Sequence, residues 1–112
     1  MSFEPRDYLR HILDEARYLL RESEDLDLAG FLGDDTRRRA FVRSLEIIGE
    51  ATKQVPDAFR VLYPDVEWRA MAAMRDRLIH AYFGVDYELV WNVVVEKIPP
   101  LEQRIMEMLE GD

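Results

Sequence analysis

Apolar residues recur at helical spacing through the first half of the chain. On the first face they are Tyr8, Leu9, Ile12, Leu13, Ala16, Leu19 and Leu20. Spacing of three and four residues is typical of an amphipathic helix, and the pattern predicts one over roughly residues 4–22. Two glycines in the stretch 23–33 indicate a loop. Three residues can then cap a second helix: Asp34, Asp35 or Thr36. Pro56 stops that helix or begins a short following one.

Two further helical patterns occupy the second half. Apolar residues repeat at helical spacing over 68–79, and Gly84 lies just beyond as an end signal. Asp86 is placed to cap a following helix. That helix contains Val93–Val95, whose neighbours follow helical spacing rather than alternation, so we predict helix and not strand there. The Pro99-Pro100 pair must kink or break the chain before a C-terminal helical part.

These patterns predict an all-α fold, an up-and-down helical bundle of four to five helices in a single domain over residues 1–112. The chain has no cysteine, so disulfides, thiolate metal sites and a cysteine nucleophile are excluded. It has no run of about 20 apolar residues and no leader pattern, so we expect a cytoplasmic protein that does not enter a membrane. The net charge of -8 argues against broad binding to nucleic acid, but not against a local basic site.

One segment carries most of the candidate chemistry. With two histidines, no HExxH, no phosphate loop and no nucleophile elbow, the familiar metal, nucleotide and esterase motifs are absent. The polar residues that remain together are Arg75, Asp76, Arg77, His80 and Tyr82. Arginine can hold a phosphodiester and stabilise its transition state, and histidine can move a proton to or from a ribose oxygen. These groups suffice for RNA cleavage without a metal or cofactor.

The spacing of these residues determines which of their side chains lie on the same face of the predicted helix. Asp76 stands four residues before His80, on the same face of a predicted helix, where it can fix the imidazole tautomer. Arg75 and His80 point roughly 140° apart on an ideal helix, so they can converge only through the long Arg side chain or a distorted helix end. A second copy across a two-fold dimer would also help, and we favour the dimer. Simpler roles also stay open: a surface ion pair for Arg75, a carbonyl contact for His80 and a partly buried ring for Tyr82.

The motif Arg75-x4-His80-x-Tyr82 resembles that of the HEPN superfamily, and more narrowly the HepT-like ribonuclease toxins. Three other segments resemble the same group: Ser44–Ala51, Tyr63–Arg69 and His80–Asp86 with Val90-Trp91. Together they extend the resemblance over about residues 5–110.

The resemblance implies a metal-independent endoribonuclease toxin of a type VII toxin–antitoxin system. It implies a homodimer with a composite cleft in which Arg75 and His80 are catalytic, supported by Asp76 and Arg77. Asp76 occupies a position that is often Asn in the family, so its role is less defined. The partner implied is a minimal nucleotidyltransferase antitoxin similar to MntA, which blocks Tyr82 by adding AMP. Bulky negative phosphates beside Arg75 would repel RNA.

Two features outside the motif each have two interpretations. The basic cluster Arg37, Arg38, Arg39 and Arg43 is either a solvated helix face or a patch that guides RNA phosphates. Positive charge at a helix start opposes the macrodipole, so stability gives no reason for it there. Gly49 permits either close helix packing within the chain or a dimer contact.

Two other functions compete with the ribonuclease. One is a non-catalytic HEPN module that binds a nucleotidyltransferase partner or nucleotides. The other is a purely structural helical homodimer.

Overall fold

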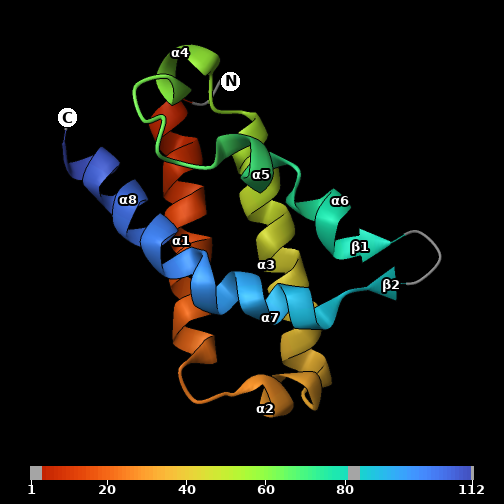
Figure 1. The fold of residues 1–112 in the computed structure, drawn as a ribbon. Coiled ribbons are helices and arrows are strands. Elements are labelled where there is room, and N and C mark those ends of the chain that lie inside the picture. Colours follow the sequence, from red (N-terminus) through yellow and green to blue (C-terminus); the bar gives the residue numbers. More distant parts are fainter. Residues whose placement is uncertain (1–3, 81–83, 112) are drawn as a thin grey trace.

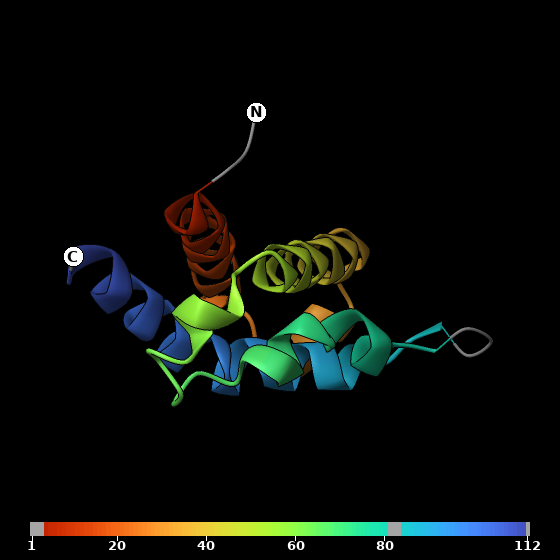
Figure 2. The same cartoon turned by 90° about the horizontal axis from the view of Figure 1, so that it is seen from above.

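The computed structural model describes residues 4–80 and 84–111, with His80 described for its backbone only. Figure 1 shows the two long helices, α1 (Pro5–Ser23) and α3 (Asp35–Lys53), running side by side in opposite directions. Seen from above, α1 and α3 form one layer, and the segments from residue 57 onward form a second layer against one side of it (Figure 2).

The second layer consists of short segments and two longer helices. Its elements are α4 (Asp57–Arg60), α5 (Trp68–Ala72), α6 (Met74–Leu78), β1 (Ile79–His80), β2 (Gly84–Val85), α7 (Tyr87–Glu96) and α8 (Ile98–Glu110). One hydrophobic core lies between the layers, with fully buried side chains from α1, α3, α7 and α8 such as Ile12, Leu45, Val94 and Ile105. The predicted all-α class is confirmed. Within the described residues, no helix is long and apolar enough to span a bilayer.

Several predicted helix boundaries are confirmed by hydrogen bonds at the caps. Among the three candidates it is Asp34 that caps α3, since its carboxylate accepts from the backbone N–H of Arg37 at 3.0 Å. Asp86 caps α7 by accepting from the N–H of Leu89 at 3.1 Å. The valines Val93–Val95 are helical, as predicted. The two prolines lie in the first turn of α8, where they cost no internal hydrogen bond.

The expected loop before α3 contains a helix that the sequence pattern missed. This is α2 (Leu28–Leu32), a single turn capped by Asp27. It exists because Phe31 is fully buried, with its ring 5.1 Å from the ring of Phe41 and 5.3 Å from that of Trp91. With α2, α4 and a divided motif helix, the described residues form eight helical segments rather than four or five.

The helix predicted over residues 68–79 is wrong in two respects. It divides at Ala73, whose backbone angles of φ -90° and ψ 8° separate α5 from α6. It then ends at Leu78, and the chain turns into an antiparallel hairpin in which Ile79 pairs with Val85 and His80 with Gly84. Gly84 has φ +78°, a conformation that a residue without Cβ adopts readily, so it belongs to the hairpin rather than to a helix end.

Gly49 is explained by packing within the chain. A Cβ at this position would lie 3.1 Å from the carbonyl oxygen of Met71 and 3.7 Å from Cβ of Met74. The absent side chain therefore lets α5 and α6 approach α3 closely. Of the two interpretations of Gly49, the structure supports the intrachain contact.

Replacing Gly49 with valine should lower the free energy of unfolding by about 1–3 kcal/mol, because the new side chain must push α5 away from α3. Thermal and urea unfolding would measure the loss. The control is Glu50→Val, which places the same residue at the next, exposed position of α3. Equal stability of the Gly49→Val variant and the native chain would contradict the close-packing argument.

An ion pair connects the turn before α5 to α8. The Arg104 guanidinium donates to both carboxylate oxygens of Asp65, from Nε at 2.8 Å and from Nη2 at 3.1 Å. This two-pronged hydrogen bond holds the pKa of Asp65 below its usual value of 3.8.

A lowered folded-state pKa means that the Asp65 contribution is present above the unfolded pKa and disappears as pH falls through the folded one. We therefore expect Asp65→Asn to be less stable than the native chain at pH 7. The difference should shrink below about pH 4 and vanish in stronger acid. Urea unfolding of both proteins across pH would show this, and a difference that stays constant down to acid pH would contradict it.

Candidate functional site

Arg75 lies on α6 with its side chain turned to solvent. The side chain is 64% exposed, and its Nε lies 3.6 Å from Oε2 of Glu46 on α3. Glu46 is more covered, at 25% exposure. The acid that accompanies Arg75 is therefore Glu46, not the adjacent Asp76. Because contacts across helices do not show in sequence spacing, Glu46 was missed, although it lies within the Ser44–Ala51 segment that carries the resemblance.

The other two motif residues are described only in part. The backbone of His80 forms the end of β1, paired with Gly84. The side chain of His80 and the whole of Tyr82 lie outside the described residues. Since α6 ends at Leu78, Asp76 and His80 do not share a helical face, so the predicted geometry for Asp76 is wrong. For the same reason the 140° separation of Arg75 and His80 does not apply.

Arg77 faces a different surface from Arg75. It lines a groove of about 600 Å³ between α5–α6 and α7–α8, with an apolar floor that includes Met71, Met74 and Val93. Arg75 does not line this groove, and Asp76 is exposed at the solvent side of α6. The structure therefore does not bring Arg75 and Arg77 together in one cavity.

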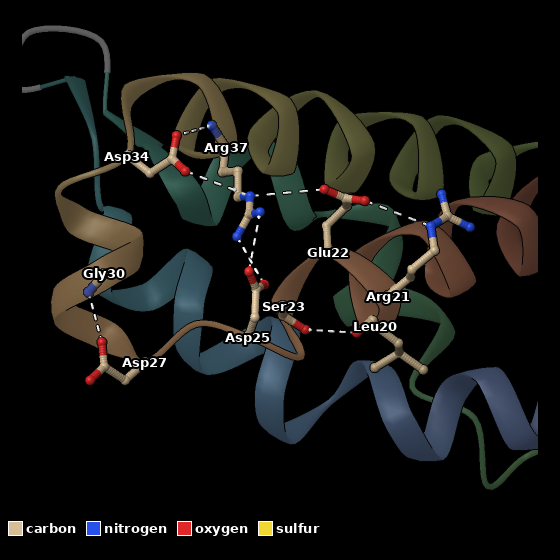
Figure 3. Close-up of polar contacts among 9 residues, drawn as sticks. All are labelled: Leu20, Arg21, Glu22, Ser23, Asp25, Asp27, Gly30, Asp34 and Arg37. Carbon is tan, nitrogen blue, oxygen red and sulfur yellow. Dashed lines mark hydrogen bonds and ion pairs between the residues drawn. The ribbon is translucent and has the colours of Figure 1, made fainter.

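The three consecutive arginines at the start of α3 are engaged in ion pairs. Figure 3 shows Arg37 among the carboxylates of Asp25, Asp34 and Glu22, at 3.0, 3.6 and 3.8 Å. The hydrogen bond to Asp25 raises the pKa of the Arg37 guanidinium.

The next two arginines share one acid. Arg38 and Arg39 both pair with Asp35, at 3.0 and 3.4 Å, and Arg38 also lies 5.0 Å from the ring centre of Tyr87. The ion pairs supply the stabilising reason that the helix macrodipole alone did not. A role in guiding RNA is not needed to explain these three residues.

Arg43 differs from its three neighbours. It is exposed and forms no ion pair with the described part of the chain. It borders a shallow depression of about 260 Å³ between α1 and α3, with Tyr8, His11, Ile47 and Glu50. Its charge is thus available to another molecule.

The described groups can bind a phosphate but do not complete a catalytic site within one copy. Arg75 offers an exposed guanidinium, a planar donor that matches phosphate oxygens, while Glu46 competes for it. Arg75 lines neither the groove nor the depression, so within one copy neither hollow encloses it. Among the described residues, no three His, Asp or Glu side chains gather as metal ligands do.

Comparisons with known proteins identify the family of this chain. The family model described as ribonuclease HepT-like matches residues 9–108. A protein of Caldanaerobacter subterraneus subsp. tengcongensis named "Putative RNase" is 46% identical over 108 residues, 96% of each chain. A "Probable ribonuclease HepT" of Thermococcus cleftensis is 42% identical over 103 residues, 92% of this chain and 94% of its own. No solved structure matches. The chain therefore belongs to the ribonuclease HepT-like family.

Proposed function

We propose that this protein is a metal-independent endoribonuclease toxin that cleaves RNA with Arg75 and His80 in a cleft shared by two copies. The observation that carries the proposal is the exposed Arg75 guanidinium, which among the described residues forms one ion pair, with Glu46 at 3.6 Å, and which lies five residues from His80. Membership of the ribonuclease HepT-like family supports the reaction class.

The chemistry follows from the two side chains. Arg75 binds the non-bridging oxygens of a phosphodiester and stabilises the charge that develops on them. The imidazole of His80 takes the proton of the ribose 2′-hydroxyl, whose oxygen then attacks the phosphorus. The bond from phosphorus to the 5′-oxygen breaks, and that oxygen receives a proton. The products are a 2′,3′-cyclic phosphate and a 5′-hydroxyl, and no metal or cofactor is required.

The second copy supplies what one copy lacks. One histidine cannot act as base and acid in the same step, whereas two copies related by a two-fold axis provide both. Arg75 also lies outside both the groove and the depression described above, which is expected if a partner forms the other wall of its site. Asp76 and Arg77 flank Arg75 as supporting residues, with Arg77 at the edge of the groove.

The proposal includes the antitoxin. A minimal nucleotidyltransferase similar to MntA would transfer AMP to Tyr82, as in a type VII toxin–antitoxin system. Each added phosphate places negative charge close to the motif, where it repels RNA and competes for Arg75. The exposed Arg75 supports this mode of inhibition, because a bulky anion can reach it.

Arg75→Ala and His80→Ala should each lower RNA cleavage by about a hundredfold or more, because each removes a group that acts in the transition state. Cleavage of a labelled RNA would be measured with EDTA present, and circular dichroism would check that both variants fold. The matched control is Arg69→Ala, which removes an exposed arginine from α5. Persistent cleavage by both motif variants would overturn the assignment. Partner binding without any RNA cleavage by the native chain would favour the non-catalytic module instead.

Co-expression with the nucleotidyltransferase should add one or more AMP masses to the native chain and none to Tyr82→Phe. Intact mass spectrometry measures this directly. Tyr63→Phe is the control, because Tyr63 lies on the turn before α5 and should not change the modification. The same mass shift in Tyr82→Phe would place the modification on another residue.

A further inference from the structure

Glu46 reaches Arg75 from a neighbouring helix that is held more firmly than its own. Glu46 belongs to α3, a helix of 19 residues, whereas Arg75 belongs to α6, which has five. The residue before Glu46 is the fully buried Leu45, so the core fixes this part of α3. The Glu46 side chain is 25% exposed and the Arg75 side chain 64%. Glu46 is therefore the more restrained member of the ion pair.

The ion pair occupies only one edge of the Arg75 guanidinium. An arginine head group presents its five N–H donors in a planar fork, with Nε at the side and Nη1 and Nη2 at the end. Oε2 of Glu46 lies 3.6 Å from Nε. Among the described residues, none accepts a hydrogen bond from Nη1 or Nη2 of Arg75. Glu46 thus shares the charge of Arg75 but leaves the two terminal nitrogens open, and these can hold two phosphate oxygens at once.

Two other arginines of the chain show the opposite arrangement. Nη1 and Nη2 of Arg37 both donate to Asp25, at 3.0 and 3.5 Å. Nη1 of Arg104 donates to Glu107 at 3.2 Å, and Nη2 donates to Asp65 at 3.1 Å. In both cases acids of the chain occupy the nitrogens that a phosphate would need. The candidate catalytic arginine is approached by an acid on the other edge.

We propose that Glu46 is a positioning residue, which orients the Arg75 guanidinium so that Nη1 and Nη2 face the phosphate to be cleaved. This inference rests on the proposed function, in which Arg75 binds that phosphate. An exposed arginine samples many rotamers, and the reaction requires one of them. An acid on a long, buried helix restricts these rotamers before the RNA arrives. The distance of 3.6 Å is compatible with this role, because such contacts are often long in a free enzyme and tighten in the complex.

A positioning role predicts different effects on turnover and on RNA binding. Glu46→Gln keeps the size of the side chain and removes its charge. The loss of orientation should lower kcat by about tenfold, since a misplacement of about 1 Å can cost about a hundredfold. The loss of a negative charge beside the phosphate should leave KM unchanged or lower it. The urea midpoint of unfolding should stay the same, because ion pairs with an exposed member contribute little to stability.

The decisive experiment is a double-mutant cycle with Arg75. If Glu46 acts through Arg75, Glu46→Gln should have no further effect on kcat in an Arg75→Ala background. Cleavage of a labelled RNA over a range of concentrations, with EDTA present, gives kcat and KM for each protein. The matched control is Glu22→Gln, which removes a similarly covered acid, 34% exposed and 3.8 Å from Arg37, and should cleave at the native rate. An unchanged kcat in Glu46→Gln, an equal loss in the control, or a further loss in the double variant would overturn the positioning role.

A second measurement needs no RNA and so separates this inference from the proposed function. The Nε–H group of Arg75 gives a proton–nitrogen NMR signal, identified by its absence in Arg75→Lys, and its heteronuclear NOE reports fast motion of the side chain. The NOE should fall in Glu46→Gln and keep its native value in Glu22→Gln. Equal values in the native chain and in Glu46→Gln would overturn the positioning role even if RNA is cleaved. A native chain that shows the expected NOE difference but cleaves no RNA would contradict the proposed function alone.

Discussion

The candidate site depends on how closely α5 and α6 approach α3 at Gly49. A Cβ there would lie 3.1 Å from a carbonyl oxygen of α5, so the contact exists only because the side chain is absent. Met74 contacts the same glycine, and Arg75 follows it directly, while Glu46 lies one turn before Gly49 on α3. The contact at Gly49 thus fixes the position of Arg75 along α3, next to Glu46. Widening the gap would separate the two charged groups before it exposed much of the core.

Much of the fold could be predicted because its long helices bury one continuous face. The apolar periodicity of α1 and α3, the cap Asp86 and the proline pair are local signals that the core reinforces. The helix α2 escaped prediction because a single buried ring, Phe31, holds it in place. The division of the motif helix at Ala73 was not predicted, because the apolar spacing continues through Ala73 into β1. Periodicity alone does not distinguish a bent helical segment from a straight one.

The site was predictable as a set of residue types but not as an arrangement. The sequence identified Arg75 as a candidate, yet its partner Glu46 is 29 positions away and only packing brings them together. The net charge of the chain was also a poor guide to the location of its positive charge. The net charge of -8 includes acids that neutralise the arginines at the start of α3, so the overall balance says little about where positive charge is free. Free charge is a property of the folded surface.

The short hairpin after α6 has a consequence for how the motif can vary. Between Arg75 and His80 the chain changes from a helix, where one added residue rotates all later residues by about 100°, to a strand, where successive residues alternate between two faces. An insertion or deletion in β1 would therefore exchange the faces of the hairpin rather than rotate it gradually. Because Asp76, Arg77 and Leu78 lie in α6 and only Ile79 lies in β1, the effect of a change in length between Arg75 and His80 depends on which of the two elements receives it.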